Sequence, residues 1–396
     1  MRSKLLFVPF AIGLVLAGPM AVASPTHAQS GPGVAAAPSV TLTASRTTVT
    51  YGKSVTFAGK ISPASGGETV AIVDQNGNQI AHDTTAADGT YSTHRIPKQN
   101  LAVHAEWTTV SSAVVHLHVR PILNAKRSAI LPFADVHVAG RLIPARAANR
   151  VAVTLSQGGK TLKRVMAKVG NRGRFAANLY VDHLGSQRVV VHERSRNFAR
   201  TSWRSNLGTP PTPGLHQGST GPFVQLLQGR LMQLHYRVAA KNGNFDYRTA
   251  DSVMAFHKVQ VMARTTSVDA ATWRALANPI RPVARDKSAG YHWEVNLTKQ
   301  VLLYVHNGKI VDILHVSTGK PSTPTLPGRF HVYQKQPGFN EKMMYYSSFF
   351  DGNRGMHGYA EVPSYAASHG CVRMPYWNAI WAYNRAPLGV GVFVYH

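Results

Sequence analysis

Cys371 is the single cysteine of the 396-residue chain, and it lies in the segment Ser368-His369-Gly370-Cys371-Val372-Arg373. A thiol reacts as the thiolate, and a nearby imidazole can take its proton or, once charged, stabilise the thiolate. His369 lies two residues before the cysteine, and His357 lies further upstream. These residue types predict a cysteine nucleophile with a histidine base. The alternative, a buried thiol acting as a small apolar group, is disfavoured by the two histidines.

The N-terminus has the pattern of an export signal. Two basic residues precede the apolar run Leu5–Ala17, which is too short for a comfortable membrane span. We expect a signal peptide over residues 1–28, cleaved after Ala23 or Ala28, although an uncleaved anchor is the alternative. Because exported proteins usually pair their cysteines as disulfides, a lone exported thiol favours a reactive role.

The formal net charge is +26, which attracts polyanions. For an exported protein, the expected partners are anionic wall polymers or lipid head groups, and no nucleic acid is expected. A purely solubilising charge is the alternative.

Two similar segments form the first half of the chain, at an offset near 81 residues. Ser54–Pro63 resembles Asp135–Pro144, and both show short alternating apolar runs divided by turn residues. This pattern predicts two antiparallel β-sandwiches, over residues 38–120 and 121–206. They are similar to bacterial immunoglobulin-like modules and lack any catalytic cluster. We interpret them as spacers, with ligand binding as the alternative.

The spacing of apolar residues changes from the alternation typical of strands to helical spacing over residues 221–277. This segment lies between predicted linkers at 207–220 and 278–290. Thr249 is a candidate N-cap for the second of three helices, and Thr272–Leu276 belongs to the last. The apolar residues at helical spacing are Phe223, Leu227, Leu231, Leu234, Val253, Phe256 and Val259.

The order of helix, Asn242–Thr249 turn, helix and Trp273 is similar to the three-helix peptidoglycan-binding-like domain. Phe256-His257 stands where that family usually has a Phe-Gln pair. The resemblance implies that this segment binds the cell wall. The same apolar pattern also suits a helical core without a ligand.

The C-terminal segment, residues 291–396, has the alternation of strands, and Asn307-Gly308 predicts a hairpin turn. The whole chain is therefore expected to be mainly β, with one small α-helical domain.

Four ordered motifs of this segment resemble the L,D-transpeptidase catalytic domain. They are His315–Lys320, Thr323–Phe330, Met356–Gly358 and Ser368–Met374. The resemblance covers nearly all of residues 291–396. It implies an exported, cell-wall-associated acyltransferase that acts on peptidoglycan stem peptides.

In that family, the cysteine attacks an amide carbonyl of a stem peptide and expels a terminal D-alanine. An amine from a second stem peptide then attacks the thioester and forms a cross-link. Attack by water would instead make the protein an L,D-carboxypeptidase, and a vestigial domain would make it a catalytically silent wall-binding scaffold. The resemblance also implies acylation of Cys371 by β-lactams of the carbapenem type.

Two histidines compete for the role of base, because spacing alone does not choose between His357 and His369. The resemblance favours His357, with the backbone carbonyl of Gly358 orienting its ring. His369 would then shape the site, or be a buried ring held by a backbone bond. The N–H groups of Gly370 and Cys371 are candidate oxyanion donors.

Substrate binding is predicted for two residues beside the nucleophile. The guanidinium of Arg373 can hold a stem-peptide carboxylate, or it can brace the loop through an ion pair. Ser368 is a candidate substrate-binding residue or a hydrogen-bond donor within the loop. The spacer between His357 and Ser368 is short for the family, which can alter the lid over the acceptor site.

No cofactor or metal is expected. His116 and His118 alternate on a predicted strand, and a zinc site would need further ligands. A solvated strand face is the preferred interpretation.

Overall fold

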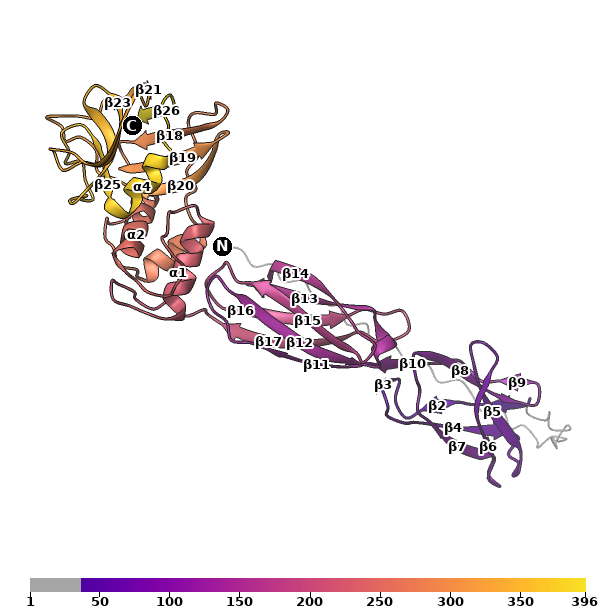
Figure 1. The fold of residues 1–396 in the computed structure, drawn as a ribbon. Coiled ribbons are helices and arrows are strands. Elements are labelled where there is room, and N and C mark those ends of the chain that lie inside the picture. Colours follow the sequence, from indigo (N-terminus) through magenta and orange to yellow (C-terminus); the bar gives the residue numbers. More distant parts are fainter. Residues whose placement is uncertain (1–36) are drawn as a thin grey trace, which may run out of the picture. The chain divides into compact units, whose positions relative to one another are not determined.

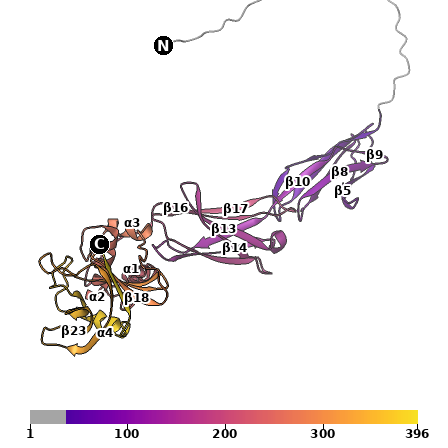
Figure 2. The same ribbon diagram turned by 90° about the horizontal axis from the view of Figure 1, so that it is seen from above.

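The computed structural model describes residues 37–396, so the predicted signal peptide lies outside the described part (Figures 1 and 2). The chain divides into two compact units. Within the described part, the first comprises residues 37–43, 57–93 and 103–114, and the second holds the remainder. Strands predominate, as predicted, and helices are concentrated in one segment of the second unit. Among the described residues, no helix has the length and apolar character needed to cross a bilayer.

The first unit consists of short, mostly antiparallel strands. One sheet has the order β1-β4-β2, with β7 also paired to β4. Strands β5, β6, β8 and β9 form further antiparallel pairs. Their bounds are β1 Ser39–Val40, β2 Thr43–Ala44, β4 Val55–Ser62, β5 Thr69–Asp74, β6 Gln79–Thr84, β7 Thr90–Arg95, β8 Leu101–Trp107 and β9 Val110–Ser111.

The second unit begins with a sandwich of two antiparallel sheets, in the orders β11-β12-β15 and β14-β13-β16-β17. Strands β3 (Thr48–Thr50) and β10 (Val115–Arg120) form a parallel pair in this unit. His116 and His118 lie on the exposed face of β10. The sandwich strands are β11 Ile122–Arg127, β12 Asp135–Ile143, β13 Arg150–Gln157, β14 Lys160–Lys168, β15 Arg174–Tyr180, β16 Gln187–Glu193 and β17 Thr201–Gly208, and a 3₁₀ turn spans Ala145–Ala147.

The two similar segments share one packing detail. A Cβ built at Gly59 would lie 2.7 Å from the Cζ atom of Tyr91, and one at Gly140 would lie 2.5 Å from that of Phe175. In each copy, glycine therefore leaves room for an aromatic ring across the sheet.

Three helices follow: α1 Pro222–Gln233, α2 Tyr247–Gln260 and α3 Ala270–Ala277. The prediction that Thr249 caps α2 is wrong, because the side chain of Asp246 accepts the Thr249 N–H and the helix begins at Tyr247. Asp269 caps α3 in the same way. Trp273 is fully buried at the centre of this helical domain.

The C-terminal domain has two sheets, in the orders β20-β19-β18-β26-β21 and β22-β23-β24-β25, and its core lies between them. Asn307 and Gly308 both have positive φ angles in the β19–β20 hairpin, as that turn predicts. The elements are β18 Tyr291–Asn296, β19 Val301–His306, β20 Lys309–His315, β21 Gly328–His331, β22 Gln334–Phe339, β23 Tyr345–Asp351, β24 Arg354–Tyr359, β25 Val372–Pro375, α4 Tyr376–Asn384 and β26 Gly391–Tyr395.

Helix α2 of the helical domain packs on strands β19 and β20 of the five-stranded sheet. Leu302 of β19 belongs to the core between the two sheets, whereas Leu303 packs in a cluster with Phe256 of α2. The backbone connects the two domains as well, because the N–H of Ile313 in β20 donates to the carbonyl of His235 at 2.8 Å. Strand β19 is therefore buried on both faces.

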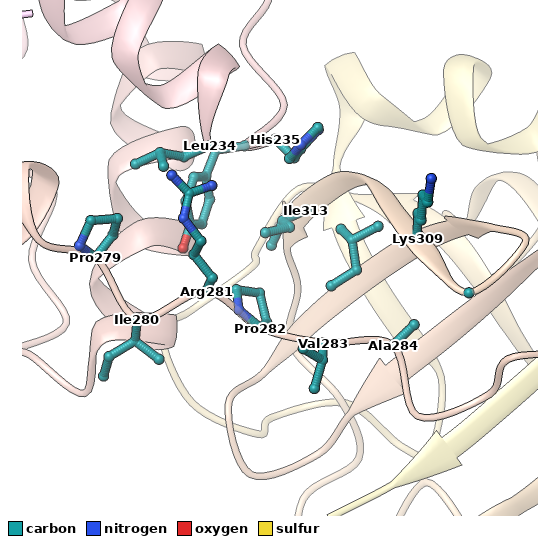
Figure 3. A pocket seen from close by; sticks show the side chains of 13 residues that line it. Leu234, His235, Pro279, Ile280, Arg281, Pro282, Val283, Ala284, Lys309 and Ile313 are labelled. Atoms are coloured by element: carbon teal, nitrogen blue, oxygen red, sulfur yellow. The ribbon is translucent and has the colours of Figure 1, made fainter.

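A cleft of about 400 Å³ lies beside this contact (Figure 3). Leu234 and His235 line it from the helical domain, and Lys309 and Ile313 line it from the sheet (Figure 3). Part of the predicted linker, Pro279–Ala284, contributes further lining residues. None of the residues around this cleft lines the pocket that holds Cys371.

Candidate active site

A pocket of about 410 Å³ in the C-terminal domain gathers most of the residues singled out in the sequence. Its lining comes from the ends of β24 and β25, the turn before β25, and the loops that flank β23. The lining residues are Lys342, Met344, Asn353, His357, Tyr359, Ser368, His369, Cys371 and Arg373.

Strands β24 and β25 bring the first histidine beside the nucleophile segment. They pair in parallel, with His357 opposite Arg373 and Gly358 opposite Met374. Because side chains alternate along a strand, His357 and Gly358 face opposite sides. A Cβ at Gly358 would lie only 2.7 Å from the Cβ of Ala379 in α4, so this side is closed by the helix and the histidine side faces the pocket.

Cys371 is presented by a turn that requires glycine. Gly370 has φ +111°, and a Cβ built there would lie 2.8 Å from the Nε atom of Arg354. Any side chain at this position would be both strained and crowded. Gly370 thus determines the path of the backbone just before Cys371.

Substituting Gly370 with alanine should lower the free energy of unfolding by about 1–3 kcal/mol. It should also slow the alkylation of Cys371 by iodoacetamide, because the turn must move away from Arg354. Thermal unfolding and the alkylation rate are the two measurements. Gly389→Ala is a matched control: Gly389 has φ +83° and open space around its Cβ position. A control that slowed alkylation equally would contradict this local explanation.

Ser368 braces the same turn from inside. Its hydroxyl donates to the carbonyl of Cys371 at 2.6 Å and accepts the N–H of Gly370 at 3.1 Å. The residue is fully buried. Its hydroxyl therefore makes the predicted hydrogen bond within the loop, and Ser368 also lines the pocket.

This bond also changes the expected oxyanion site. The N–H of Gly370 is occupied by Ser368, so it is not a free donor in this conformation. The N–H of Cys371, in contrast, has no hydrogen-bond partner within residues 37–396. The Cys371 amide is therefore the better candidate for an oxyanion donor.

The ring of His357 is held in one tautomer. Its Nδ1–H donates to the carbonyl of Gly358 at 2.9 Å, which leaves Nε2 as a proton acceptor. Burial lowers the pKa of His357 to about 4, and nearby Arg373 acts in the same direction. At neutral pH, His357 is an uncharged base.

The thiol of Cys371 is also uncharged at rest. Burial raises its pKa, although a hydrogen bond from the Gly355 backbone and the charge of Arg373 oppose the shift. The sulfur lies 3.7 Å from the carbonyl oxygen of Asn353, to which it donates. A neutral thiol and a neutral imidazole thus line the same pocket, and these are the protonation states that general-base catalysis uses.

His369 does not fit the alternative of a buried ring. It is exposed at the rim of the pocket, so it is not a buried ring held by a backbone bond. It lines the same pocket as His357 but lacks that residue's fixed tautomer.

Arg373 has no acidic partner. Its guanidinium lies 4.0 Å from the centre of the Tyr359 ring, and no carboxylate of the described residues lies within 4.0 Å of it. The predicted alternative of a bracing ion pair is absent from the described part. A cation lining the pocket without an anion can bind a substrate carboxylate.

Some residues of the pocket come from loops that sequence patterns did not single out. Lys342 and Met344 come from the loop between β22 and β23, and Asn353 comes from the β23–β24 turn. Such residues carry no periodic signal, although the Gly352-Asn353 turn marks a bend near the site.

Comparison with known proteins identifies two domains. Residues 290–394 match the model of the YkuD family, the L,D-transpeptidase catalytic domain, and residues 220–276 match a family of peptidoglycan binding domains. No curated protein matches the chain.

Several solved structures are similar. An L,D-transpeptidase from Xylanimonas cellulosilytica is 34% identical, with 47% of this chain and 100% of that chain covered and a TM-score of 0.44. An L,D-transpeptidase from Stackebrandtia nassauensis is 22% identical, with 48% and 98% covered and a TM-score of 0.32. The catalytic domain of an E. faecium L,D-transpeptidase, acylated by ertapenem, is 25% identical, with 28% and 100% covered and a TM-score of 0.24.

Domains that act on and bind peptidoglycan place the protein outside the cytoplasm, at the cell wall. The ordered motifs, the pocket that unites them and the matched family model agree. The chain belongs to the L,D-transpeptidase family, with its catalytic domain at residues 290–394 and a peptidoglycan binding domain at residues 220–276.

Proposed function

We propose that this protein cross-links or remodels peptidoglycan stem peptides through a thioester on Cys371. One observation carries the proposal: a single pocket holds a thiol, a neutral histidine with Nε2 unprotonated, and an arginine without an acidic partner. These are a nucleophile, a base and a carboxylate-binding group.

The first half-reaction forms the acyl-enzyme. Arg373 binds a carboxylate of the donor peptide, and the sulfur of Cys371 attacks the amide carbonyl carbon. The thiol proton passes to Nε2 of His357, and the N–H of Cys371 donates to the developing oxyanion. As the C–N bond breaks, the leaving amine of D-alanine takes the proton from Nε2.

The second half-reaction releases the acyl group. The amine of a second stem peptide attacks the thioester carbonyl and gives a proton to Nε2 of His357. The sulfur of Cys371 leaves and regains that proton, and a new amide bond remains. Water in place of the amine would give the carboxypeptidase reaction instead.

Acylation by a β-lactam tests the nucleophile directly. We expect ertapenem to add once to the full chain, and the adduct to be absent from Cys371→Ala. Intact-mass spectrometry followed by peptide mapping locates the adduct. An unmodified wild-type protein would contradict the proposed function.

Substituting Arg373 with glutamine should weaken donor binding. Loss of a charge-assisted bond to a carboxylate is expected to raise KM for a stem peptide by about 10–100-fold, with a smaller effect on kcat. Steady-state kinetics measure the change. Arg329→Gln is the control, because Arg329 is exposed and lines a different pocket. A KM unaffected by Arg373→Gln would show that the carboxylate binds elsewhere.

A further inference from the structure

A lysine of the helical domain ends inside the catalytic domain. Lys258 of α2 is 1% exposed, and its Nζ atom donates to the carbonyls of Gln300 at 3.0 Å and Val316 at 2.8 Å. The third acceptor is Nδ1 of His315, at 2.7 Å. Nε2 of His315 donates to the carbonyl of Val362 at 2.8 Å, so Nδ1 is free to accept. All three hydrogen-bond partners of the Lys258 amino group therefore lie in the catalytic domain.

Burying this lysine is energetically costly. No carboxylate of the described residues lies within 4.0 Å of Lys258, and burial lowers the pKa of its amino group to about 6, so neutral acceptors alone hold this group. A buried amino group is tolerated only where its hydrogen bonds are well formed. The three bonds thus fix the end of β20 against α2.

The segment held in this way supports the nucleophile. Beyond Val316, Ser317 and Arg373 exchange two backbone hydrogen bonds, each 2.9 Å long. The N–H of Lys320 donates to the carbonyl of Ser368, also at 2.9 Å. The turn that presents Cys371 therefore rests on the strand end that Lys258 anchors.

The loop between the two catalytic motifs, residues 360–367, is held from the same side. Arg264, which follows α2, donates to the carbonyls of Ser364 at 2.6 Å and Thr298 at 3.0 Å. His315 adds the bond to Val362. The helical domain thus contacts the loop that joins the strand of His357 to the turn of Cys371.

We propose that the peptidoglycan binding domain is a positioning part of the catalytic unit, and that Lys258 and Arg264 set the placement of the Cys371 turn. The inference builds on the proposed thioester chemistry. Neither residue lines the pocket, so both act through the segments that they hold. A displacement of about 1 Å at a reacting group can cost about 100-fold in rate.

The test uses the full chain with Lys258→Met and Arg264→Gln. The matched controls are Lys241→Met and Arg274→Gln, both exposed on the helical domain. Intact-mass spectrometry follows the reaction with ertapenem and gives two values: the rate constant, and the fraction of protein acylated at the end. We expect a rate at least about 10-fold lower for Lys258→Met and a few-fold lower for Arg264→Gln, with complete acylation in both.

The two values separate positioning from folding. A purely structural role would lower the acylated fraction and leave the rate constant of the remaining protein unchanged, and this result would overturn the inference. If Lys258→Met fails to fold, the test rests on Arg264→Gln, because the Arg264 side chain is exposed. An unchanged acylation rate constant in Arg264→Gln would then overturn the inference. A wild-type protein inert to ertapenem would instead refute the proposed function, and the inference with it.

Discussion

Substituting Cys371 with serine is expected to abolish acyl transfer, with a loss of at least about 10⁴-fold in rate. We expect this loss because His357 is a weak base, not because the serine side chain fits the pocket poorly. Because burial lowers the pKa of His357 to about 4, its neutral ring is a weak proton acceptor. It can take a proton from a thiol during attack, but an alcohol holds its proton far more tightly.

Product formation from a stem peptide and an amine acceptor measures this loss. Thermal unfolding of Cys371→Ser is the control and should match the wild type closely. A serine variant that retained activity within tenfold of the wild type would show that a stronger base than His357 serves the site.

Substituting His357 with alanine is expected to slow acylation by about 10²–10⁴-fold. The pH dependence should change as well. In the wild type, the ring accepts a proton above its pKa of about 4 and is blocked below it, so the acylation rate should fall only in strong acid. Without the ring, the rate should rise steadily with pH, because the thiol must then ionise to solvent.

The rate of ertapenem acylation measured from about pH 3 to pH 8 tests both expectations. His369→Ala is the matched control, since His369 lines the same pocket but is exposed. We expect that variant to stay within about tenfold of the wild type. A larger loss for His369→Ala than for His357→Ala would transfer the role of base to His369.

The sequence predicted the parts of the fold that depend on local patterns. Alternating residues marked the strands, and Asn307-Gly308 marked a hairpin. The cap of α2 was misplaced because Asp246 and Thr249 are both good capping residues, and only the backbone geometry distinguishes them. Each of these features is determined by residues only a few positions apart in the chain.

The packing of the helical domain onto the sheet was not predicted. A helical stripe shows that a face is buried, but it does not identify what covers that face. The continuous apolar run Val301–Val305 was the available signal, because a strand buried on both faces loses its alternation. Lys258 gave no signal at all, since a lysine on a helix usually faces water.

In the candidate active site, motif order indicated candidate reactive residues but not the hydrogen bonds that their atoms make. Ser368 and Gly370 stand beside the nucleophile in the chain, and only the structure shows their mutual hydrogen bond. The neutral state of Cys371 and His357 depends on burial by segments distant in sequence. Protonation is therefore a property of the assembled pocket.

The most direct test of the account follows a stem tetrapeptide ending in D-alanine, incubated with the full chain and an amine-bearing acceptor peptide. Mass spectrometry of protein and peptides is the measurement. We expect an acyl adduct on Cys371 that lacks the D-alanine, and a cross-linked product lighter than its two parent peptides together by one alanine. Trimmed donor without cross-linked product would identify a carboxypeptidase. Unchanged peptides and an unmodified Cys371 would contradict the account.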